Sequence, residues 1–194
     1  MASGNKMKIE VKLLGHIDLR KYSDAHKDLD CKGKFKLEVV NNPLLPVGAL
    51  GPIRVPAVLM AVCKDCKTAF LVPGFRESLE LMIATQLALS KEMLSKPQIK
   101  FLRQHFDLTQ EALALKIGIP DRHTFSKMES ITSPRTMSLE TQVIMKLLFA
   151  KILGIKEAEK LYSLVENRDD NAVAEIDSSA LPSEEDVKKL LDAG

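Results

Sequence analysis

Cys63 and Cys66 form a C-x-x-C motif in the stretch "VCKDC". Thiolates at this spacing can share one tetrahedral zinc ion, whose other ligands usually come from a second pair elsewhere in the chain. The same motif can carry redox chemistry, which usually sits at a helix start in a βαβ unit. Here the motif follows an apolar run, residues 53–63, that is typical of a strand. The pattern therefore favours metal binding over redox chemistry.

A second group of reactive side chains lies in "LTQEALALKIGIPDRHTFSKME", residues 108–129. Thr109 can cap a first helix and Asp121 a second. Gly118, between them, can adopt the left-handed conformation that ends many helices. Helices this short are marginal in isolation, so packing must hold them at a fixed angle. The pattern predicts a helix-turn-helix.

The second of these helices has an inner and an outer face. Phe125 and Met128 are predicted to point inward, and the outer face is then polar and basic. Arg and Lys can bind guanine in the major groove of DNA, while His, Ser and Thr can contact bases or phosphate. Gln110, at the start of the first helix, suits a phosphate contact. The predicted DNA-binding residues are Gln110, Arg122, His123, Thr124, Ser126 and Lys127. The alternative is a bundle hairpin with an ordinary polar outer face.

The remaining histidines do not suggest catalysis. Neither His16 nor His105 is paired with a nucleophile and a carboxylate in a recognisable pattern, and no glycine-rich phosphate loop appears. His105 is predicted near a helix end, where a partly charged imidazole interacts favourably with the helix dipole. The sequence therefore predicts a protein that is not an enzyme.

The elements around these residues follow from periodicity. "KFKLEVV", residues 34–40, alternates apolar and polar side chains as a half-buried strand does. "IRVPAVLMAVC", residues 53–63, predicts a second strand, with Pro56 confining its start to a sheet edge. Helical spacing predicts one long helix over residues 75–94, and further helices follow it. Those are expected over residues 95–106, 137–154 and 156–167, with a last one near the C-terminus capped by Ser183.

These elements predict an α+β protein. Residues 1–75 form a small β-rich domain that carries the C-x-x-C, and residues 76–160 hold a linking helix and an all-α helix-turn-helix domain. Residues 161–194 form an acidic tail, with three basic and nine acidic residues and a net charge of −6. The first part of this tail is polar enough to be disordered.

Composition narrows the class of protein. Hydrophobic residues make up 45% of the chain and the mean hydropathy is −0.03, as expected for a folded, soluble protein. No apolar run could span a bilayer, and the N-terminus lacks an apolar signal core. Three cysteines, an odd number, argue against a secreted disulfide framework. The sequence predicts a cytoplasmic location.

Two family resemblances add to this reading. "LTQEALALKIG" followed by "TFSKME" resembles the Xre-type phage-repressor helix-turn-helix, over about residues 96–155. "VCKDC", a long helix and "IKFLRQHFDLTQEALALKIG" together resemble the MqsA/YgiT-type antitoxins, over roughly residues 28–155. Those antitoxins join a zinc-binding domain with two C-x-x-C pairs to a DNA-binding domain of this type.

The chain departs from both patterns. It has one residue more than the usual turn between Gly118 and Phe125, so the turn is expected to loop out at residues 119–120. The resemblance implies a first cysteine pair upstream, where Cys31 stands with Asp28 in place of its partner. His26 or Asp28 can complete one structural zinc site with Cys31, Cys63 and Cys66. Alternatively the site has decayed and packing alone holds the domain.

The resemblance implies a sequence-specific repressor that acts as the antitoxin of a type II toxin–antitoxin pair and autoregulates its operon. Its expected partners are a double-stranded DNA operator, a second copy of the chain in a homodimer, and a basic toxin encoded by a neighbouring gene. A stand-alone Xre-type regulator of a phage or mobile-element operon is one alternative. A protein-interaction module whose helix-turn-helix is only structural is another.

Overall fold

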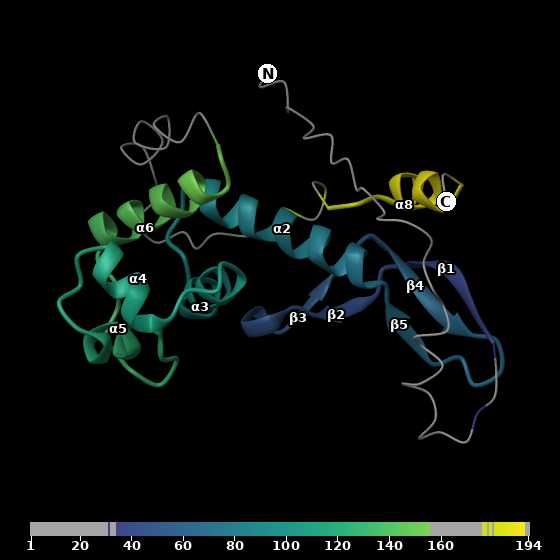
Figure 1. Ribbon diagram of the computed structural model, residues 1–194, viewed down its shortest axis with the longest axis horizontal. Coiled ribbons are helices and arrows are strands. Elements are labelled where there is room, and N and C mark those ends of the chain that lie inside the picture. Colours follow the sequence, from purple (N-terminus) through teal and green to yellow (C-terminus); the bar gives the residue numbers. More distant parts are fainter. Residues whose placement is uncertain (1–30, 32–33, 156–175, 178, 180, 193–194) are drawn as a thin grey trace. The chain divides into compact units, whose positions relative to one another are not determined.

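The computed structural model describes residues 31, 34–155, 176–177, 179 and 181–192 (Figure 1). The chain is a mixed α+β protein with a small antiparallel sheet near the N-terminus and several helices, as predicted. It divides into two compact units that interleave along the sequence. A sheet unit comprises Met1–Leu45, Ile53–Leu79 and Ser178–Gly194, and a helical unit comprises Pro46–Pro52 and Glu80–Asp177. The domain boundaries drawn from the sequence stay predictions.

The sheet unit is built on three antiparallel strands in the order β1-β4-β5. These are β1 (Phe35–Asn41), β4 (Ala57–Cys63) and β5 (Ala69–Leu71). Pairing between the first two runs from Phe35 opposite Cys63 to Asn41 opposite Ala57. Every residue of β4 except Met60 is buried, so both faces of this central strand are covered.

The predicted strand over residues 53–63 is interrupted by Pro56. Its first part is β3 (Pro52–Arg54), which pairs with β2 (Leu44–Pro46) in a separate two-stranded sheet. The short 3₁₀ helix η2 (Gly48–Leu50) lies between them in the sequence. The prediction of one continuous strand was wrong, because the chain forms two strands: the start, β3, is an edge strand as expected of the residues before Pro56, whereas β4 is central. Pro56 precedes β4 and removes no ladder donor, and its carbonyl accepts a hydrogen bond from the Asn42 amide at 2.9 Å.

A C-terminal helix, α8 (Glu184–Asp192), completes the sheet unit. It contacts β1 and β4, and its Val187 is fully buried. The side-chain amide of Asn41 donates a hydrogen bond to the Glu184 carboxylate at 3.0 Å. The predicted cap is confirmed, since the Ser183 hydroxyl accepts from the Asp186 amide at 3.2 Å. At least this part of the predicted acidic tail is therefore folded, while residues 156–175, which include a predicted helix, lie outside the described residues.

The helical unit contains most of the helices that the structure describes. α2 (Pro73–Leu89) begins in the sheet unit and continues into this one. It is followed by α3 (Lys96–His105), α4 (Gln110–Lys116), α5 (Arg122–Glu129) and α6 (Leu139–Ile152). Their largest fully buried side chains include Ile99, Leu102, Leu113, Phe125 and Phe149. Among the helices that the structure describes, none has both the length and the apolar character that a bilayer crossing requires.

The long helix predicted over residues 75–94 ends earlier, at Leu89. The chain after it is held by two buried polar side chains of α6. The Lys146 ammonium donates to the carbonyls of Ser90, at 2.8 Å, and Glu92. The Gln142 side chain accepts from the Leu94 amide at 2.7 Å. These contacts satisfy backbone groups that a continued helix would have bonded internally.

Candidate functional site

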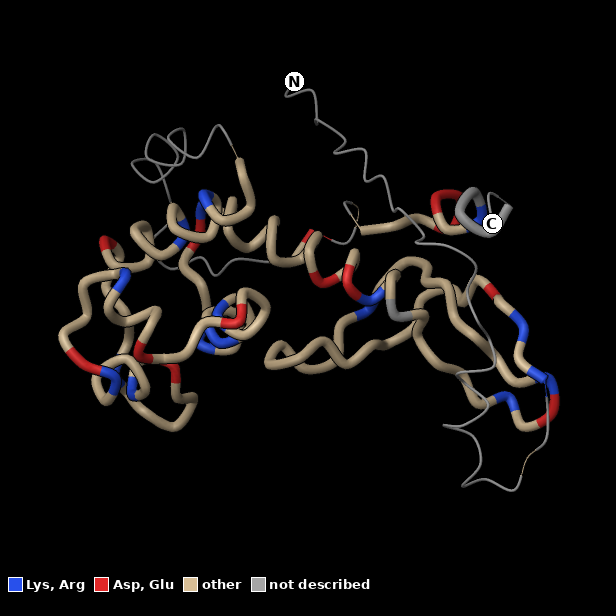
Figure 2. Tube along the Cα trace, viewed as in Figure 1, with Lys and Arg blue, Asp and Glu red and all other residues tan. Residues whose placement is uncertain are grey.

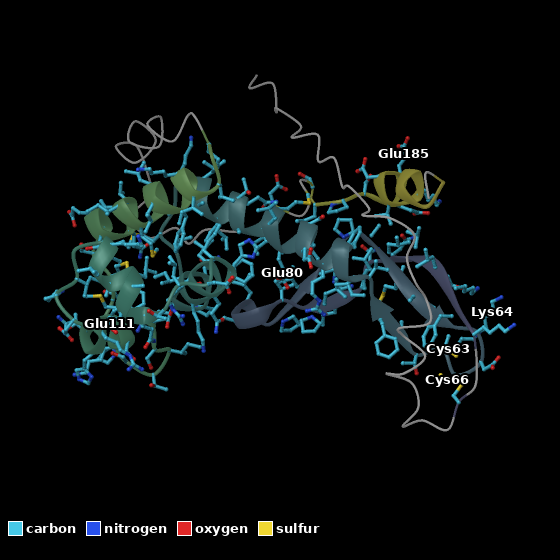
Figure 3. The ribbon with its side chains drawn as sticks, in the orientation of Figure 1. Cys63, Lys64, Cys66, Glu80, Glu111 and Glu185 are labelled. Carbon is cyan, nitrogen blue, oxygen red and sulfur yellow. The ribbon has the colours of Figure 1, made fainter. Side chains whose placement is uncertain are left out.

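The C-x-x-C motif begins at Cys63, the last residue of β4, and ends at Cys66 in the turn that leads to β5; Figure 3 labels both cysteines. The Cys63 amide donates to the Thr68 carbonyl at 2.9 Å, and the Lys64 amide donates to the Lys34 carbonyl at 3.0 Å. Lys67 follows the motif and has φ of 63°, in the left-handed backbone region that residues other than glycine rarely adopt. The turn thus brings the two cysteines close together at one end of the sheet.

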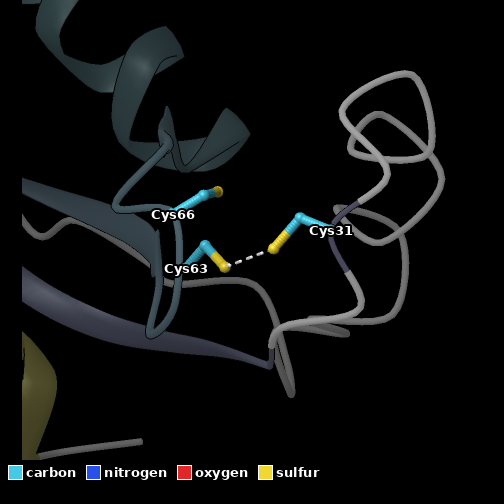
Figure 4. A group of neighbouring side chains, drawn as sticks. All are labelled: Cys31, Cys63 and Cys66. Carbon is cyan, nitrogen blue, oxygen red and sulfur yellow. Dashed lines mark hydrogen bonds between the residues drawn. The ribbon is translucent and has the colours of Figure 1, made fainter.

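The three cysteines form one thiol cluster, Cys31, Cys63 and Cys66 (Figure 4). Their sulfur atoms all lie within 4.8 Å of one another, and the Cys31 and Cys63 sulfurs are 3.8 Å apart. Two thiolates bound to a tetrahedral zinc at about 2.3 Å stand about 3.8 Å apart, so the spacing fits a shared metal ion. The cluster is therefore compatible with one zinc ion.

The three thiols differ in their exposure to solvent. Cys63 is fully buried, Cys31 is half-buried and Cys66 is exposed. A second contact holds the exposed one, because the Cys66 sulfur lies 3.1 Å from the Thr68 hydroxyl. The predicted further ligands, His26 and Asp28, lie outside the described residues, so a fourth ligand stays a prediction.

A turn of five residues joins α4 to α5, and both helices begin at the predicted caps. The Thr109 hydroxyl accepts from the Ala112 amide at 3.0 Å, and the Asp121 carboxylate accepts from the Thr124 amide at 2.8 Å. The hydrogen bond from the Thr124 backbone is the main cause that lowers the pKa of Asp121. These caps satisfy amides that would otherwise be unpaired at each helix start.

Within the turn, Gly118 has φ of 77°. This left-handed backbone costs glycine little. The Ile119 amide donates to the Ala114 carbonyl at 2.9 Å, and the Ile119 side chain is buried while Pro120 is exposed. The chain after α4 thus folds back onto its last turn before α5 begins.

The outer face of α5 carries the polar side chains expected there. Arg122, His123 and Lys127 are exposed, and Thr124 and Ser126 are half-buried. Lys and Arg positions along this part of the chain can be followed in Figure 2. The two inward predictions fared differently: Phe125 is fully buried, but Met128 is only half-buried. The residue that α5 buries at its C-terminal end is Glu129, which is 5% exposed.

Glu129 is the centre of a polar cluster that joins three helices. Its carboxylate accepts two hydrogen bonds from Arg103 of α3, at 2.8 Å and 3.1 Å. The carboxylate also accepts a hydrogen bond from the side-chain amide of Gln110, at the start of α4, at 2.7 Å. The Arg103 guanidinium donates in addition to the Leu108 carbonyl at 2.9 Å. Such bidentate, charge-assisted bonds are strong and directional, so the cluster fixes α5 against α3 and α4.

The sequence analysis did not predict this cluster: it gave Arg103 no role, and Glu129 stood only as part of the quoted motif "TFSKME". The phosphate contact of Gln110 stays a prediction, and in the structure the Gln110 side chain donates to Glu129. One signal was available in the sequence. Glu129 stands four residues after the buried Phe125, and residues at this spacing share one face of a helix.

Two polar hollows border the outer face of α5. The first is lined by Arg103, Thr109, Gln110, Glu111 and Arg122. The second is lined by His123, Ser126, Lys127, Ser130, Thr132, Ser133, Pro134 and Arg135. No Asp or Glu is among the described residues that line the second hollow. The Lys96 ammonium, from the first turn of α3, donates to the Ser130 carbonyl at 3.0 Å and to the Ser133 carbonyl, and so holds the loop that forms this hollow.

His105 differs from its prediction. It lies in the last turn of α3, as expected, but it is half-buried and its ring stacks on Phe101 with centroids 5.7 Å apart. Burial lowers the pKa of His105, and the nearby carboxylates Glu80 and Asp107 oppose this shift. Burial therefore works against the partial charge expected at the helix end.

Comparison with known proteins identifies no relatives. No family model, no curated protein and no solved structure matches this chain. The similarity to Xre-type repressors and to MqsA/YgiT-type antitoxins thus rests on the quoted motifs alone and stays a prediction.

Proposed function

We propose that the helical unit binds double-stranded DNA in a sequence-specific manner through α5, as a helix-turn-helix with α4. The observation that carries this proposal is the division of α5 into two faces. Phe125 and Glu129 hold one face in the unit, while Arg122, His123 and Lys127 are exposed on the other. A helix that is rigidly held and polar outward is what readout in the major groove requires.

The chemistry of the exposed side chains supports this role. The guanidinium of Arg122 can bind guanine O6 and N7 together, which discriminates between bases. Lys127 and Arg135 line a hollow without a carboxylate among its described residues, and cations in such a setting attract backbone phosphate. Gln110, engaged with Glu129, then acts by supporting α5 rather than through phosphate alone.

Gel-shift titration against DNA from the chain's own promoter region tests the proposal. Arg122→Ala is expected to cost about 1–3 kcal/mol of binding free energy and to relax specificity, whereas Lys127→Ala weakens all sequences evenly. Lys151→Ala, at an exposed position on α6, is the charge-matched control and leaves binding unchanged. Unaltered affinity in the Arg122→Ala/Lys127→Ala double variant would exclude α5 as the DNA contact.

We infer that the DNA-bound form is a homodimer. One such helix covers only a few base pairs, and two half-sites about one turn of DNA apart multiply the contacts. Ile144 and Ile152 of α6 are 43% and 47% exposed, and their spacing puts them on one side of the helix. Light scattering of the free and DNA-bound protein tests this, with Ile144→Glu expected to give monomers. A monomer on DNA in the unaltered protein contradicts it.

We infer that the thiol cluster binds one structural zinc ion per chain. The support is the spacing of the three sulfurs, which fits shared coordination. Elemental analysis of protein prepared without chelators is expected to give about one zinc per chain, and Cys63→Ser is expected to abolish it. Comparison of His26→Ala with Asp28→Ala then identifies the fourth ligand. A zinc content near zero in folded protein means that packing alone holds the sheet.

The regulatory role that we propose is that of a repressor and antitoxin, whose partner is a basic toxin encoded beside it. The support is the motif resemblance and the acidic first turn of α8, Glu184, Glu185 and Asp186. A stand-alone phage or mobile-element regulator is the second candidate, and a pure protein-interaction module would lack DNA affinity. Co-expression of the neighbouring gene with the full chain separates the first two. If the product of the neighbouring gene is harmless, or is toxic and the chain fails to restrain it, the antitoxin role is excluded and the stand-alone regulator remains.

A further inference from the structure

The thiol cluster has a second property besides its spacing, namely a gradient of accessibility. Cys66 is exposed at the turn, whereas Cys63 is fully buried at the end of β4. A small oxidant from solution therefore meets Cys66 and cannot meet Cys63. Exposed thiols are the ones that a dissolved peroxide reaches and oxidises.

The surroundings of Cys66 favour this reactivity. The Thr68 hydroxyl lies 3.1 Å from its sulfur, and this contact positions the sulfur within the turn. The Cys63 sulfur lies within 4.8 Å of the Cys66 sulfur. Both sulfurs belong to one short turn, which the Cys63–Thr68 backbone bond closes, so the second thiol is available as soon as the first is oxidised.

We propose that Cys63 and Cys66 form a reversible disulfide in response to hydroperoxides, with Cys66 as the reacting thiol and Cys63 as the resolving thiol. In the first step the Cys66 thiol takes one oxygen from hydrogen peroxide, which gives a sulfenic acid and one water. In the second step the Cys63 thiol attacks that sulfur, which forms the S–S bond and releases the oxygen as a second water. The cysteine pair loses two electrons and the peroxide gains them. A dithiol reductant reverses the change by exchange.

This site and the zinc site use the same atoms, so they exclude each other. The disulfide removes two of the three thiolates that the cluster offers and leaves Cys31 as a single thiol. Oxidation of the zinc-loaded protein therefore releases the metal. The oxidation itself needs no metal. The test of this proposal is therefore independent of zinc binding and of DNA binding.

The sequence permits a direct test, because trypsin separates all three cysteines. Cleavage after lysine and arginine places Cys31 in residues 28–32, Cys63 in residues 55–64 and Cys66 in residues 65–67. The full chain, with zinc removed, is treated with hydrogen peroxide, blocked at its remaining thiols and digested. Mass spectrometry is expected to find residues 55–64 linked to residues 65–67, and a dithiol is expected to abolish that link. A dominant link between residues 28–32 and 55–64 overturns the proposal.

Two variants assign the roles of the thiols. Cys66→Ser removes the Cys63–Cys66 link, and the disulfide that its remaining thiols, Cys31 and Cys63, can form is expected to appear roughly tenfold or more slowly, because those thiols are less accessible. Cys31→Ser is the matched control and keeps both the link and its rate. Equal rates in Cys66→Ser and the unaltered chain overturn the assignment, as does loss of the link in Cys31→Ser protein that circular dichroism shows to be folded. In protein loaded with zinc beforehand, a chromogenic chelator is expected to detect metal release that parallels the link.

Discussion

The two units of this protein each gather polar side chains from distant parts of the sequence, but they satisfy them differently. In the helical unit, the carboxylate of Glu129 binds Arg103 and Gln110, and Lys146 binds backbone carbonyls. In the sheet unit, the gathered groups are three thiols. A thiol is a weak hydrogen-bond donor and acceptor, and its strong bonds are to a metal or to a second sulfur.

This difference suggests that the units respond differently to their surroundings. Among the residues that the structure describes, the helical unit satisfies its buried charges with its own donors and acceptors. The sheet unit holds groups whose bonding depends on metal supply and on redox conditions. Chemical sensitivity is therefore expected in the sheet unit, and mutational sensitivity at charged residues in the helical unit.

The largest expected effect comes from Glu129→Ala. Removal of this carboxylate leaves the Arg103 guanidinium, whose side chain is 13% exposed, without its bidentate partner. Breaking a buried ion pair in this way costs about 3–5 kcal/mol. Hydrogen exchange monitored by mass spectrometry is expected to show faster exchange in α3, α4 and α5, with the sheet unchanged.

Glu111→Ala is the matched control for that measurement, since Glu111 is an exposed carboxylate of α4 (Figure 3). It is expected to change stability by no more than about 0.5 kcal/mol. Equal effects of the two variants would show that the Glu129 cluster adds nothing to the helical unit, and the contrast between the units would then fail.

A smaller effect is expected from Val187→Ala, which tests the sheet unit. Val187 is a fully buried residue of α8, a helix that contacts β1 and β4. Loss of two methyl groups there costs about 2 kcal/mol in transfer and cavity terms. Exchange should rise in α8, β1 and β4 and stay constant in α3 to α6. Lys188→Ala, at the exposed neighbour, serves as control, and a change in the helical unit would contradict the division.

Thr109→Ala is expected to cost about 1 kcal/mol, because it removes the side-chain acceptor for the Ala112 amide at the start of α4. The sharper expectation concerns function. A frayed α4 weakens the support of α5, so DNA affinity should fall for all sequences alike. Thr109→Ser keeps the hydroxyl and should restore both stability and affinity. Failure of the serine variant to do so would mean that the cap is not the cause.

The smallest expected effect is a pH dependence of the helical unit through His105. Burial lowers the pKa of His105 in the folded state, so the unfolded chain takes up a proton at higher pH than the folded one. The stabilisation is fully present above the ordinary histidine pKa of about 6.5 and is lost as pH falls below it. Thermal melts of the unaltered chain and His105→Gln across pH 5–8 should diverge, with His123→Gln as control. Parallel curves would contradict the assignment.

Local patterns in the sequence predicted local structure well. Alternation located β1, and side-chain oxygens located the caps Thr109, Asp121 and Ser183, because each of these depends on residues within one turn or strand. Long-range bonding was not predictable in the same way. α2 ends at Leu89 because Lys146 and Gln142 bind the chain that follows, and they stand about fifty residues away along the chain.

The same limit applied to the candidate site. The C-x-x-C could be read directly, since both its ligands lie in one short turn. The burial of Glu129 could not, because its partner Arg103 precedes it by 26 residues and a charged residue usually indicates a solvated surface. The prediction of one strand through Pro56 was wrong for a third reason. In the sequence alone, a proline that separates two strands looks the same as a proline at the start of an edge strand, because the pairing of the strands is not known.

The hydrogen bond between Asn41 and Glu184 joins residues 143 positions apart. A ribosome adds roughly 5–20 residues per second, so on the order of 7 to 29 s pass between the synthesis of Asn41 in β1 and that of Glu184 in α8. Arg103 and Glu129 are only 26 residues apart, so the corresponding interval between their synthesis is on the order of 1 to 5 s. The nascent chain should therefore carry the finished cluster of α3, α4 and α5 while β1 and β4 still lack α8, and that interval is when chaperones and proteases can act on the strands.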